Sequence, residues 1–507
     1  MADETTPILV GVGQVTEKDK PLDQASSPVD LMEQAVKIAC DDAGIPASKM
    51  ADIDTLVVVK SFRETTRNSP EALAKRIGAS AAKQWLMPDG GNGPQYLVNR
   101  YAEAITKGEA KFCLFSGAEA IDNETRFKKA GETPPWEEAS DTDPEFLYPD
   151  RKMWGKPERM HGLLLPAHVY PLYENGLRHH YGRSIDEHQM KMGELFQPFS
   201  EVAAQSPHAW FPIARSAEEI ATATPKNRYV GWPYTKFMNA MNQINQSAAL
   251  LLTSVAYAKE LGIDESKWIY LHGCADTSEL WTISERTNFY SSPAIRVMGE
   301  KTMAMAGKTI DDMAFIDFYS CFPSAVQIAR DEFGIPAGDK RPLTITGGLP
   351  FHGGAGNNYV MNSIAAMVDK LRAAPGKFGL VTANGGYLTK HSAGIYSTTP
   401  NEKPWQREDP ASYQPIIENT PHPEHVEEAS GPATIETYTV TFGREGTPEA
   451  GFVVGRLGAI DDVNAKRFLA HTPQDTDLFK AMTSEDFIGR AGDVTHKDGV
   501  NVFTPKL

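Results

Sequence analysis

The sequence predicts an α/β protein in which a mostly parallel sheet is covered by helices and which is built from two related halves. Apolar runs that end at glycine alternate with segments of helical periodicity, as in strand–helix–strand units. A glycine-rich turn, a helix, a strand and a second small-residue turn also occur twice in the same order. The chain has 507 residues, which is enough for two or three domain-sized units.

The elements of the first half begin near the N-terminus. Residues 8–13 form a short apolar run that ends at glycine, as expected for a buried strand. Residues 29–43 have apolar side chains at helical spacing, and residues 53–59 read as the next strand. The pair Gly11 and Gly13 resembles part of a dinucleotide fingerprint, but the third glycine is absent and no helix opens there, so we expect no NAD(P) site.

The repeated unit predicts an internal duplication, although glycine-opened units are common enough for coincidence. The first copy consists of the turn 90–93, the helix 95–105, the strand 112–115 and the turn 116–119. The second copy consists of the turn 353–356, the helix 359–371, the strand 379–382 and the turn 383–386.

The remaining segments complete the predicted domain organisation. We expect a first half at 1–260 that carries an inserted domain at about 122–240, where Pro, Trp, His and charged residues are frequent. A second half at 261–397 precedes a linker at 398–432, which is rich in Pro, Glu and Ser. Residues 433–507 predict a small β-rich domain, for which a five-stranded OB-like barrel is one candidate.

The composition limits the classes of function. The formal net charge is -16, which opposes binding to nucleic acid or to anionic membranes. No apolar run approaches the ~20 residues that span a bilayer, and the N-terminus is acidic, unlike a secretory signal. We therefore expect a cytoplasmic protein. The four cysteines are widely spaced and form no zinc or disulfide pattern.

Five landmarks, which together cover roughly residues 8–397, resemble the thiolase superfamily. The run Gly90-Gly91-Asn92-Gly93, followed by Ser116-Gly117-Ala118-Glu119, resembles the thiolase nucleophile loop and the Gly-x-Glu strand end. The other landmarks are Ile244-Asn245-Gln246-Ser247-Ala248-Ala249, Asp317-Phe318-Tyr319-Ser320-Cys321-Phe322, Gly347 to Gly353, and Ala383-Asn384-Gly385-Gly386. With the extra C-terminal domain, the chain resembles the thiolase-like protein type 1 group, often labelled acetyl-CoA acetyltransferase. This resemblance implies a duplicated αβαβα core with an inserted loop domain.

The resemblance also implies that both catalytic cysteines are missing. The nucleophile position falls at Gly90 and the proton-shuttle position at Ala383. Thiolase turnover needs a thiolate to accept the acyl group, so ordinary turnover is not expected. Cys321 stands in a motif, but in the resembling family that cysteine is not the nucleophile.

The oxyanion-stabilising residues are retained in this comparison. His352 could donate from its ring to a thioester oxygen, with Asn384 nearby. The amides of Gly90 or Gly91 and of Gly385 or Gly386 could form a second anion hole. Tyr319 stands where the family has His or Asn and could donate a hydrogen bond, or act as a base if its pKa were lowered. The alternative for each residue is packing or turn formation.

Candidate ligand contacts precede the Ile244 landmark. Arg228 and Lys236 could receive nucleotide phosphates, or could be solvated surface charges. Asn242 and Ser247 are further candidates by the motif match. We expect coenzyme A or acyl-CoA as a ligand, no permanent cofactor and no metal, because His179, His180 and His188 lie in a helical stretch without metal-site spacing.

Three functions remain open at this stage. The first is an acyl-CoA acyltransferase of the thiolase type, which the missing cysteines oppose. The second is a lyase that cleaves β-hydroxyacyl-CoA by a retro-aldol reaction through Tyr319, because such cleavage needs no cysteine. The third is a non-catalytic acyl-CoA-binding protein. Either a monomer or a homodimer is possible.

Overall fold

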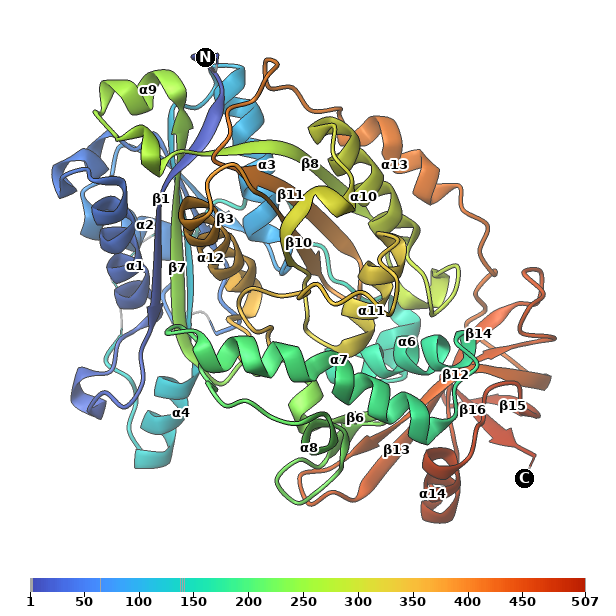
Figure 1. Ribbon diagram of the computed structural model, residues 1–507. Helices are drawn as coiled ribbons and strands as arrows, with labels where there is room; N and C mark the ends of the chain where they lie inside the picture. Colours follow the sequence, from blue (N-terminus) through green and yellow to red (C-terminus); the bar gives the residue numbers. More distant parts are fainter. Residues whose placement is uncertain (1–2, 64, 137, 139, 141, 507) are drawn as a thin grey trace.

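The computed structural model describes residues 3–63, 65–136, 138, 140 and 142–506. Residues 137, 139 and 141 of the predicted insert lie outside this range. The core is a nine-stranded sheet in the order β3-β2-β4-β7-β1-β8-β11-β10-β9 (Figure 1). Its strands are β1 (Pro7–Thr16), β2 (Thr55–Val59), β3 (Lys83–Met87), β4 (Phe112–Ala120), β7 (Asn245–Ser254), β8 (Ile269–Ser278), β9 (Met313–Asp317), β10 (Phe378–Gly385) and β11 (Lys390–Ser397).

The strand order confirms the predicted duplication. The first half contributes β3-β2-β4-β7-β1, and the second contributes β8-β11-β10-β9, so equivalent strands lie symmetrically about the β1–β8 junction. That junction is short, with Ile8 opposite Tyr270 and Leu9 opposite Ile269. Among the described residues the second half has no counterpart of β3.

The helices give five layers. α3 (Gly93–Thr106) and α12 (Tyr359–Ala373) pack on each other and on strands of both halves, so they form the central layer. α1 (Pro28–Ala43) covers the first half of the sheet, next to α2 (Ser69–Ile77), and α10 (Pro293–Ala306) covers the second half, next to α11 (Pro323–Glu332). The sequence of layers is therefore α–β–α–β–α, as the resemblance implied.

Glycines allow the outer helices to approach the strands closely. A Cβ atom on Gly13 of β1 would collide with the backbone carbonyl oxygen of Ala35 in α1. A Cβ on Gly273 of β8 would collide in the same way with the carbonyl oxygen of Thr302 in α10. The glycine pair near the N-terminus therefore serves helix–strand packing and not dinucleotide binding.

The insert between β4 and β7 contains several helices. It contains α4 (Ile121–Ala130), α5 (Lys156–Met160), α6 (Pro166–His180), α7 (Ile185–Gln205), α8 (Ala217–Ala221), β5 (Tyr229–Gly231) and β6 (Tyr234–Thr235). Two of the helices, α6 and α7, carry the stretch around His179, His180 and His188 that was predicted to be helical. Between β7 and β8 lies α9 (Val255–Glu260).

The C-terminal region forms a closed five-stranded barrel (Figure 1, lower right). Its elements are β12 (Gly431–Phe442), β13 (Pro448–Arg456), β14 (Arg467–His471), α14 (Thr476–Ser484), β15 (Ala491–Lys497) and β16 (Val500–Pro505). The pairing β12–β13–β14–β16–β15–β12, with β14 and β16 parallel and the helix after the third strand, is the topology of an OB-like barrel. The sequence analysis had not identified β15.

The barrel is joined to the insert. Thr441 of β12 pairs with Gly231 of β5, so the insert strands extend the barrel sheet. Trp232 lies in the apolar core of the barrel and stacks on Tyr438 with ring centroids 5.5 Å apart. The C-terminal region therefore packs closely on the lobe that the first half inserts.

The sheet edge at β3 is covered by the chain itself. The N–H of Leu86 donates to the carbonyl oxygen of Glu145 at 2.8 Å, and the N–H of Leu147 donates to the carbonyl oxygen of Leu86 at 3.0 Å. Because this pairing occupies part of the exposed edge, β3 is a poor template for a second copy of the chain. No helix in the described part of the chain is both long enough and apolar enough to cross a membrane.

The segment predicted as a linker contacts the core. It includes α13 (Pro410–Glu418), which packs on β8 and α10. Just before this helix, Arg407 donates to Glu103 of α3 at 2.9 Å and to Asp276 of β8 at 2.6 Å. The side chains of Arg407 and Asp276 are 8% and 9% exposed, so this ion pair is almost fully desolvated.

We predict that Arg407→Ala lowers the free energy of unfolding by ~3 kcal/mol, because it leaves the buried carboxylate of Asp276 without its partner. Burial already raises the pKa of Asp276 although Arg407 opposes this shift. The loss should therefore shrink as the pH falls toward the range in which the carboxyl is protonated. Urea denaturation at several pH values measures both effects.

Lys466→Ala is the control for this measurement, because it removes an ion pair with Glu424 that is 48% and 66% exposed. Such a pair contributes about 0–1 kcal/mol. Equal losses for the two variants would contradict the anchoring role of Arg407.

Candidate active site

The two glycine turns predicted as halves of one site lie against each other. A Cβ atom on Gly385 would be 3.0 Å from the Cα of Gly90 and would collide with the side chain of Asn92. The N–H of Gly90 donates to Oδ1 of Asn357 at 2.8 Å. The amide group of Asn357 also donates to the carbonyl oxygen of Lys60 at 2.9 Å. Asn357 therefore fixes the turn and occupies the Gly90 amide, which cannot serve as an anion-hole donor in this geometry.

The neighbouring amides differ from that of Gly90. Within the described residues, the N–H groups of Gly91 and Gly386 have no hydrogen-bond acceptor. Both glycines line the central cavity described below. The sequence analysis left open whether Gly90 or Gly91, and whether Gly385 or Gly386, donates to an anion. The structure favours the N–H groups of Gly91 and Gly386.

Tyr319 lines the central cavity next to Gly91. A Cβ atom on Gly91 would collide with the hydroxyl of Tyr319, so glycine at 91 makes room for the phenol. The N–H of Tyr319 donates to Oγ1 of Thr382 at 3.0 Å, which fixes the main chain where β9 ends. Burial raises the pKa of Tyr319 well above its ordinary value, and Cys321 and Tyr359 raise it further. Tyr319 is therefore a protonated hydrogen-bond donor and not a phenolate base.

Asn384 and Cys321 form the adjoining wall. The Nδ2 of Asn384 donates to the hydroxyl of Tyr170 at 2.8 Å and lies 4.0 Å from the Sγ of Cys321. Burial raises the pKa of the Cys321 thiol to about 12, so it carries no thiolate near neutral pH. Ala383, the predicted shuttle position, does not line this cavity.

These residues line the central cavity, which has a volume of about 660 Å³. One wall comes from the insert and includes Tyr170 at the centre of α6. The other wall comes from the two glycine turns and from the loop after β9. The cavity therefore lies where the insert covers the C-terminal ends of β2, β3, β9 and β10, the edge at which open α/β sheets bind ligands.

His352 stands behind this cavity and not on its lining. Its side chain is buried, and neither ring nitrogen makes a hydrogen bond of ordinary geometry with a described residue. The ring contacts Tyr359 edge to face at 5.8 Å, and Tyr359 makes the same contact with Tyr319. Burial, with His208, lowers the pKa of His352 to about 3, so the imidazole is neutral at physiological pH.

The predicted phosphate contacts lie on the cavity lining. Arg228 and Lys236 flank the β5–β6 hairpin, and the N–H of Lys236 donates to the carbonyl oxygen of Arg228 at 2.9 Å. Asn242 lines the cavity and is exposed. Ser247 is wrongly placed as a ligand contact: it is buried in β7 and donates to the carbonyl oxygen of Gly117 at 2.9 Å.

Several lining residues were missed by the sequence analysis. Arg151 and Lys152 add two cations to the lining, and neither has an ion-pair partner among the described residues. The sequence shows that these two cations are adjacent in a charged insert. It does not show that the fold of the insert places them on the cavity. Tyr170 and Asn357 could not be found, because each acts across more than 200 positions of sequence.

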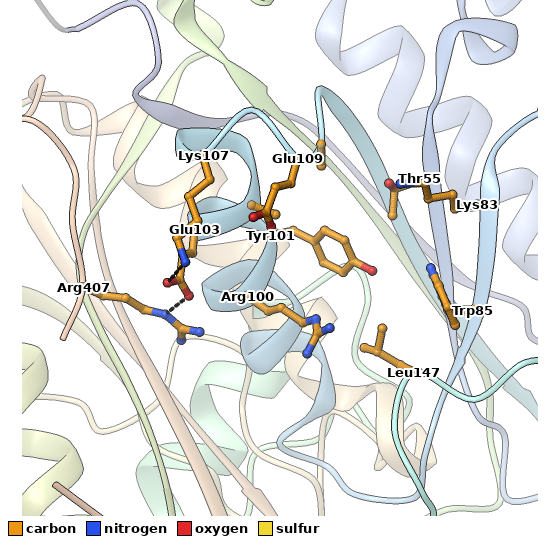
Figure 2. Close-up of a pocket in the computed structure, with 12 residues that line it drawn as sticks. Thr55, Lys83, Trp85, Arg100, Tyr101, Glu103, Lys107, Glu109, Leu147 and Arg407 are labelled. Carbon is orange, nitrogen blue, oxygen red and sulfur yellow. Dashed lines mark hydrogen bonds and ion pairs between the residues drawn. The ribbon is translucent and has the colours of Figure 1, made fainter. Parts of the chain in front are cut away.

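A further cavity of about 330 Å³ lies between α3 and β3, and it contains none of the predicted residues. Figure 2 shows that Glu103, on the lining of this cavity, binds both Lys107 and Arg407. We interpret this cavity as a structural ion-pair network. In the described residues no group of three or more His, Cys, Asp or Glu side chains could hold a metal ion.

Known proteins resemble the chain at two levels. Residues 413–499 match the family of the thiolase-like protein type 1 additional C-terminal domain. The crystal structure of a monomeric SCP2-thiolase like protein type 1 from Mycobacterium smegmatis is 38% identical, with a TM-score of 0.85 and coverage of 99% of both chains. No curated protein matches in sequence.

More distant structures share the fold alone. An Ltp2-ChsH2(DUF35) aldolase is 21% identical with a TM-score of 0.60, and the match covers 79% of this chain and 99% of that one. The acetyl-CoA acetyltransferase from Syntrophomonas wolfei is 14% identical with a TM-score of 0.55, and the match covers 78% and 100%.

We predict that the native protein resists thiol alkylation near neutral pH. All four cysteines are buried, and burial raises the pKa of each, to about 11 for Cys40 and about 12 for Cys321. Mass spectrometry after iodoacetamide treatment at pH 7.5 should show almost no label, whereas denatured protein should take up four. Rapid labelling of Cys321 in native protein would show an accessible thiolate.

Proposed function

Because the chain belongs to the family of SCP2-thiolase-like proteins type 1, we propose that its central cavity binds acyl-CoA and holds the thioester without forming an acyl-enzyme. One observation carries this proposal. The lining combines cations that have no ion-pair partner among the described residues with hydrogen-bond donors, and no cysteine thiolate reaches it. The ligand that this arrangement suits carries both phosphates and a carbonyl oxygen.

The cations suit the phosphates of the nucleotide. Arg228 and Lys236 have no ion-pair partner among the described residues, and Arg151 and Lys152 lie on the same lining. The acids nearby, Asp89 and Asp150, are instead paired with Lys60 at 2.9 and 3.1 Å. In a chain with a net charge of -16, this cluster is available to an anionic ligand.

The hydrogen-bond donors on the lining suit the thioester oxygen. The N–H groups of Gly91 and Gly386, which have no acceptor among the described residues, and the hydroxyl of Tyr319 can each donate a hydrogen bond to it. The neutral ring of His352 lies behind Tyr359 and would need a side-chain movement to take part. We therefore assign the leading role in polarising the thioester to Tyr319 and the two amides.

A carbon–carbon lyase is the second candidate, and Tyr319 favours it. Retro-aldol cleavage of a β-hydroxyacyl-CoA requires a base that takes the proton of the β-hydroxyl group and a donor that stabilises the enolate oxygen, and it does not require a thiol. One structural neighbour is an aldolase, although its likeness to this chain is one of fold. In this reaction Tyr319 would donate to the developing oxyanion, since its raised pKa rules out the role of base.

We also propose that the protein is a monomer. The covered edge of β3 supports this state, because residues 145–147 occupy hydrogen-bonding groups that a second copy would need. The 38% identical relative from Mycobacterium smegmatis is monomeric.

Titration calorimetry with CoA tests the binding role. We expect Arg228→Ala and Lys236→Ala each to weaken binding about tenfold, since a hydrogen bond to a charged group contributes roughly 1.5 kcal/mol or more. Lys226→Ala is the matched control: it is an exposed cation two positions from Arg228 that does not line the cavity. If wild-type protein does not bind CoA, or if all three variants bind equally, the proposed phosphate contacts are wrong.

Tyr319→Phe tests the lyase role. With a β-hydroxyacyl-CoA as substrate, we expect kcat to fall about 100-fold, because one oxyanion donor is removed. The Kd for CoA should stay within about twofold, since the phosphate contacts are unchanged. Chromatography of the acyl-CoA products measures cleavage. Undiminished cleavage by the variant would exclude this role of Tyr319, and no cleavage by wild type would exclude the lyase.

A further inference from the structure

A lateral cavity of about 780 Å³ lies next to the turn 89–92, and its lining differs from that of the central cavity. Its walls come from β8, from the start of β11 and from residues 409–418. Lys390, Asn92 and Tyr148 line it, and Arg151 is shared with the central cavity. None of the functions considered so far uses Lys390.

The side chain of Lys390 fills the space next to Gly90. It extends from the first residue of β11 and is 8% exposed. A Cβ atom on Gly90 would be 2.7 Å from its Nζ and 2.8 Å from its Cε. The ammonium group donates to the carbonyl oxygen of Asp89 and lies 6.0 Å from the ring centre of Tyr148. The amine is therefore held within the core at the edge of the cavity.

The positive charge of Lys390 is only partly balanced by nearby carboxylates. Asp89 and Asp150 are the acids that face it, but the carboxylates of both bind Lys60. Tyr148, whose pKa burial raises, and His391 on the same strand, whose pKa burial lowers to about 3, are further titratable neighbours, and both are uncharged at neutral pH. The same cavity is also lined by Arg151 and Arg407 and by the acids Asp276, Glu279, Glu285, Asp409 and Glu418.

Burial therefore has a larger effect on the pKa of Lys390 than the nearby carboxylates have. It lowers the pKa of Lys390 to about 8, although Asp150 and Asp89 oppose the shift. The neutral fraction at pH 7 is then roughly 300-fold larger than for an ordinary lysine. Only the neutral amine is a nucleophile, which is why desolvated lysines serve in covalent catalysis.

Asn92 gives independent support for a ligand in this cavity. Its side chain is 4% exposed and lines the cavity, and its Oδ1 has no hydrogen-bond donor among the described residues. A buried acceptor of this kind is costly unless a ligand or water supplies a donor. The Oδ1 is also close to the place beside Gly90 that Lys390 fills.

We propose that the lateral cavity is a second reaction site, in which Nζ of Lys390 condenses with the carbonyl group of an aldehyde or ketone. The neutral amine attacks the carbonyl carbon, so that a C–N bond forms and the oxygen takes up a proton. The resulting hydroxyl can donate to Oδ1 of Asn92. Loss of water from this carbinolamine then gives the Schiff base, and no oxidant or reductant is needed. The proposal does not depend on CoA binding.

Reductive trapping tests the proposal. Folded protein is treated briefly with propanal and cyanoborohydride at pH 7, and peptide mass spectrometry measures the label on each lysine. Lys128 is the internal comparator, because it is exposed and has no ion-pair partner among the described residues. We expect Lys390 to be labelled at least about tenfold faster than Lys128, because more of its amine is neutral. The ratio should fall toward pH 10, where exposed lysines also lose their proton.

Lys390→Arg is the matched variant, since it keeps the charge and can still donate to Asp89 but forms no Schiff base. It should abolish the rapid phase of labelling and leave the rate at Lys128 unchanged. Labelling of Lys390 no faster than Lys128, or only after denaturation, would overturn the proposal. Because that comparison uses wild-type protein alone, it holds even if the variant does not fold.

Discussion

The contact between the turns 90–92 and 384–386 is the constraint on which the rest of the site depends. The backbones approach so closely that a Cβ on Gly385 would be 3.0 Å from the Cα of Gly90. Asn357 holds this arrangement by accepting from the Gly90 amide. A side chain at position 90 would also collide with Lys390. The packing around position 90 therefore leaves no room for a cysteine side chain. A cysteine there would require Asn92 and Lys390 to move.

The contact between the two turns lies where the two related halves of the core meet. The turn 90–92 leads into α3, which packs on β10 and β11 of the second half, and the turn 384–386 connects these two strands, so the halves meet at the turns. The outer helices α1 and α10 approach the sheet closely in both halves because Gly13 and Gly273 allow direct contact with helix carbonyl groups. Equivalent packing on both sides thus brings two distant segments together at one edge of the sheet.

Local periodicity predicted most of the core, and long-range contacts explain most of what was missed. The strands at 8–13 and 112–115 and the helix at 359–371 were found because their apolar side chains recur at regular spacing. The insert was expected as a separate domain with a helical stretch around His179, His180 and His188. The bounds of α6 were not predicted, because this helix is buried on all faces from 169 to 178 and shows no clear polar side. Arg407 looked like part of a linker, since its partners Glu103 and Asp276 are 304 and 131 positions away.

For the predicted site residues, the sequence indicates which residues share a cavity but not whether they are protonated. Gly90, Tyr319, Asn384, Arg228 and Lys236 line one cavity, and the order of the motifs along the chain was enough to group them. Their protonation states could not be predicted, because these depend on burial. Burial keeps both Tyr319 and Cys321 protonated, yet it favours the neutral form of Lys390. The same low-polarity surroundings thus suppress the thiolate and phenolate while they increase the nucleophilicity of the amine. Burial thus acts in opposite directions on the pKa values of acids and bases, because in each case it disfavours the charged form.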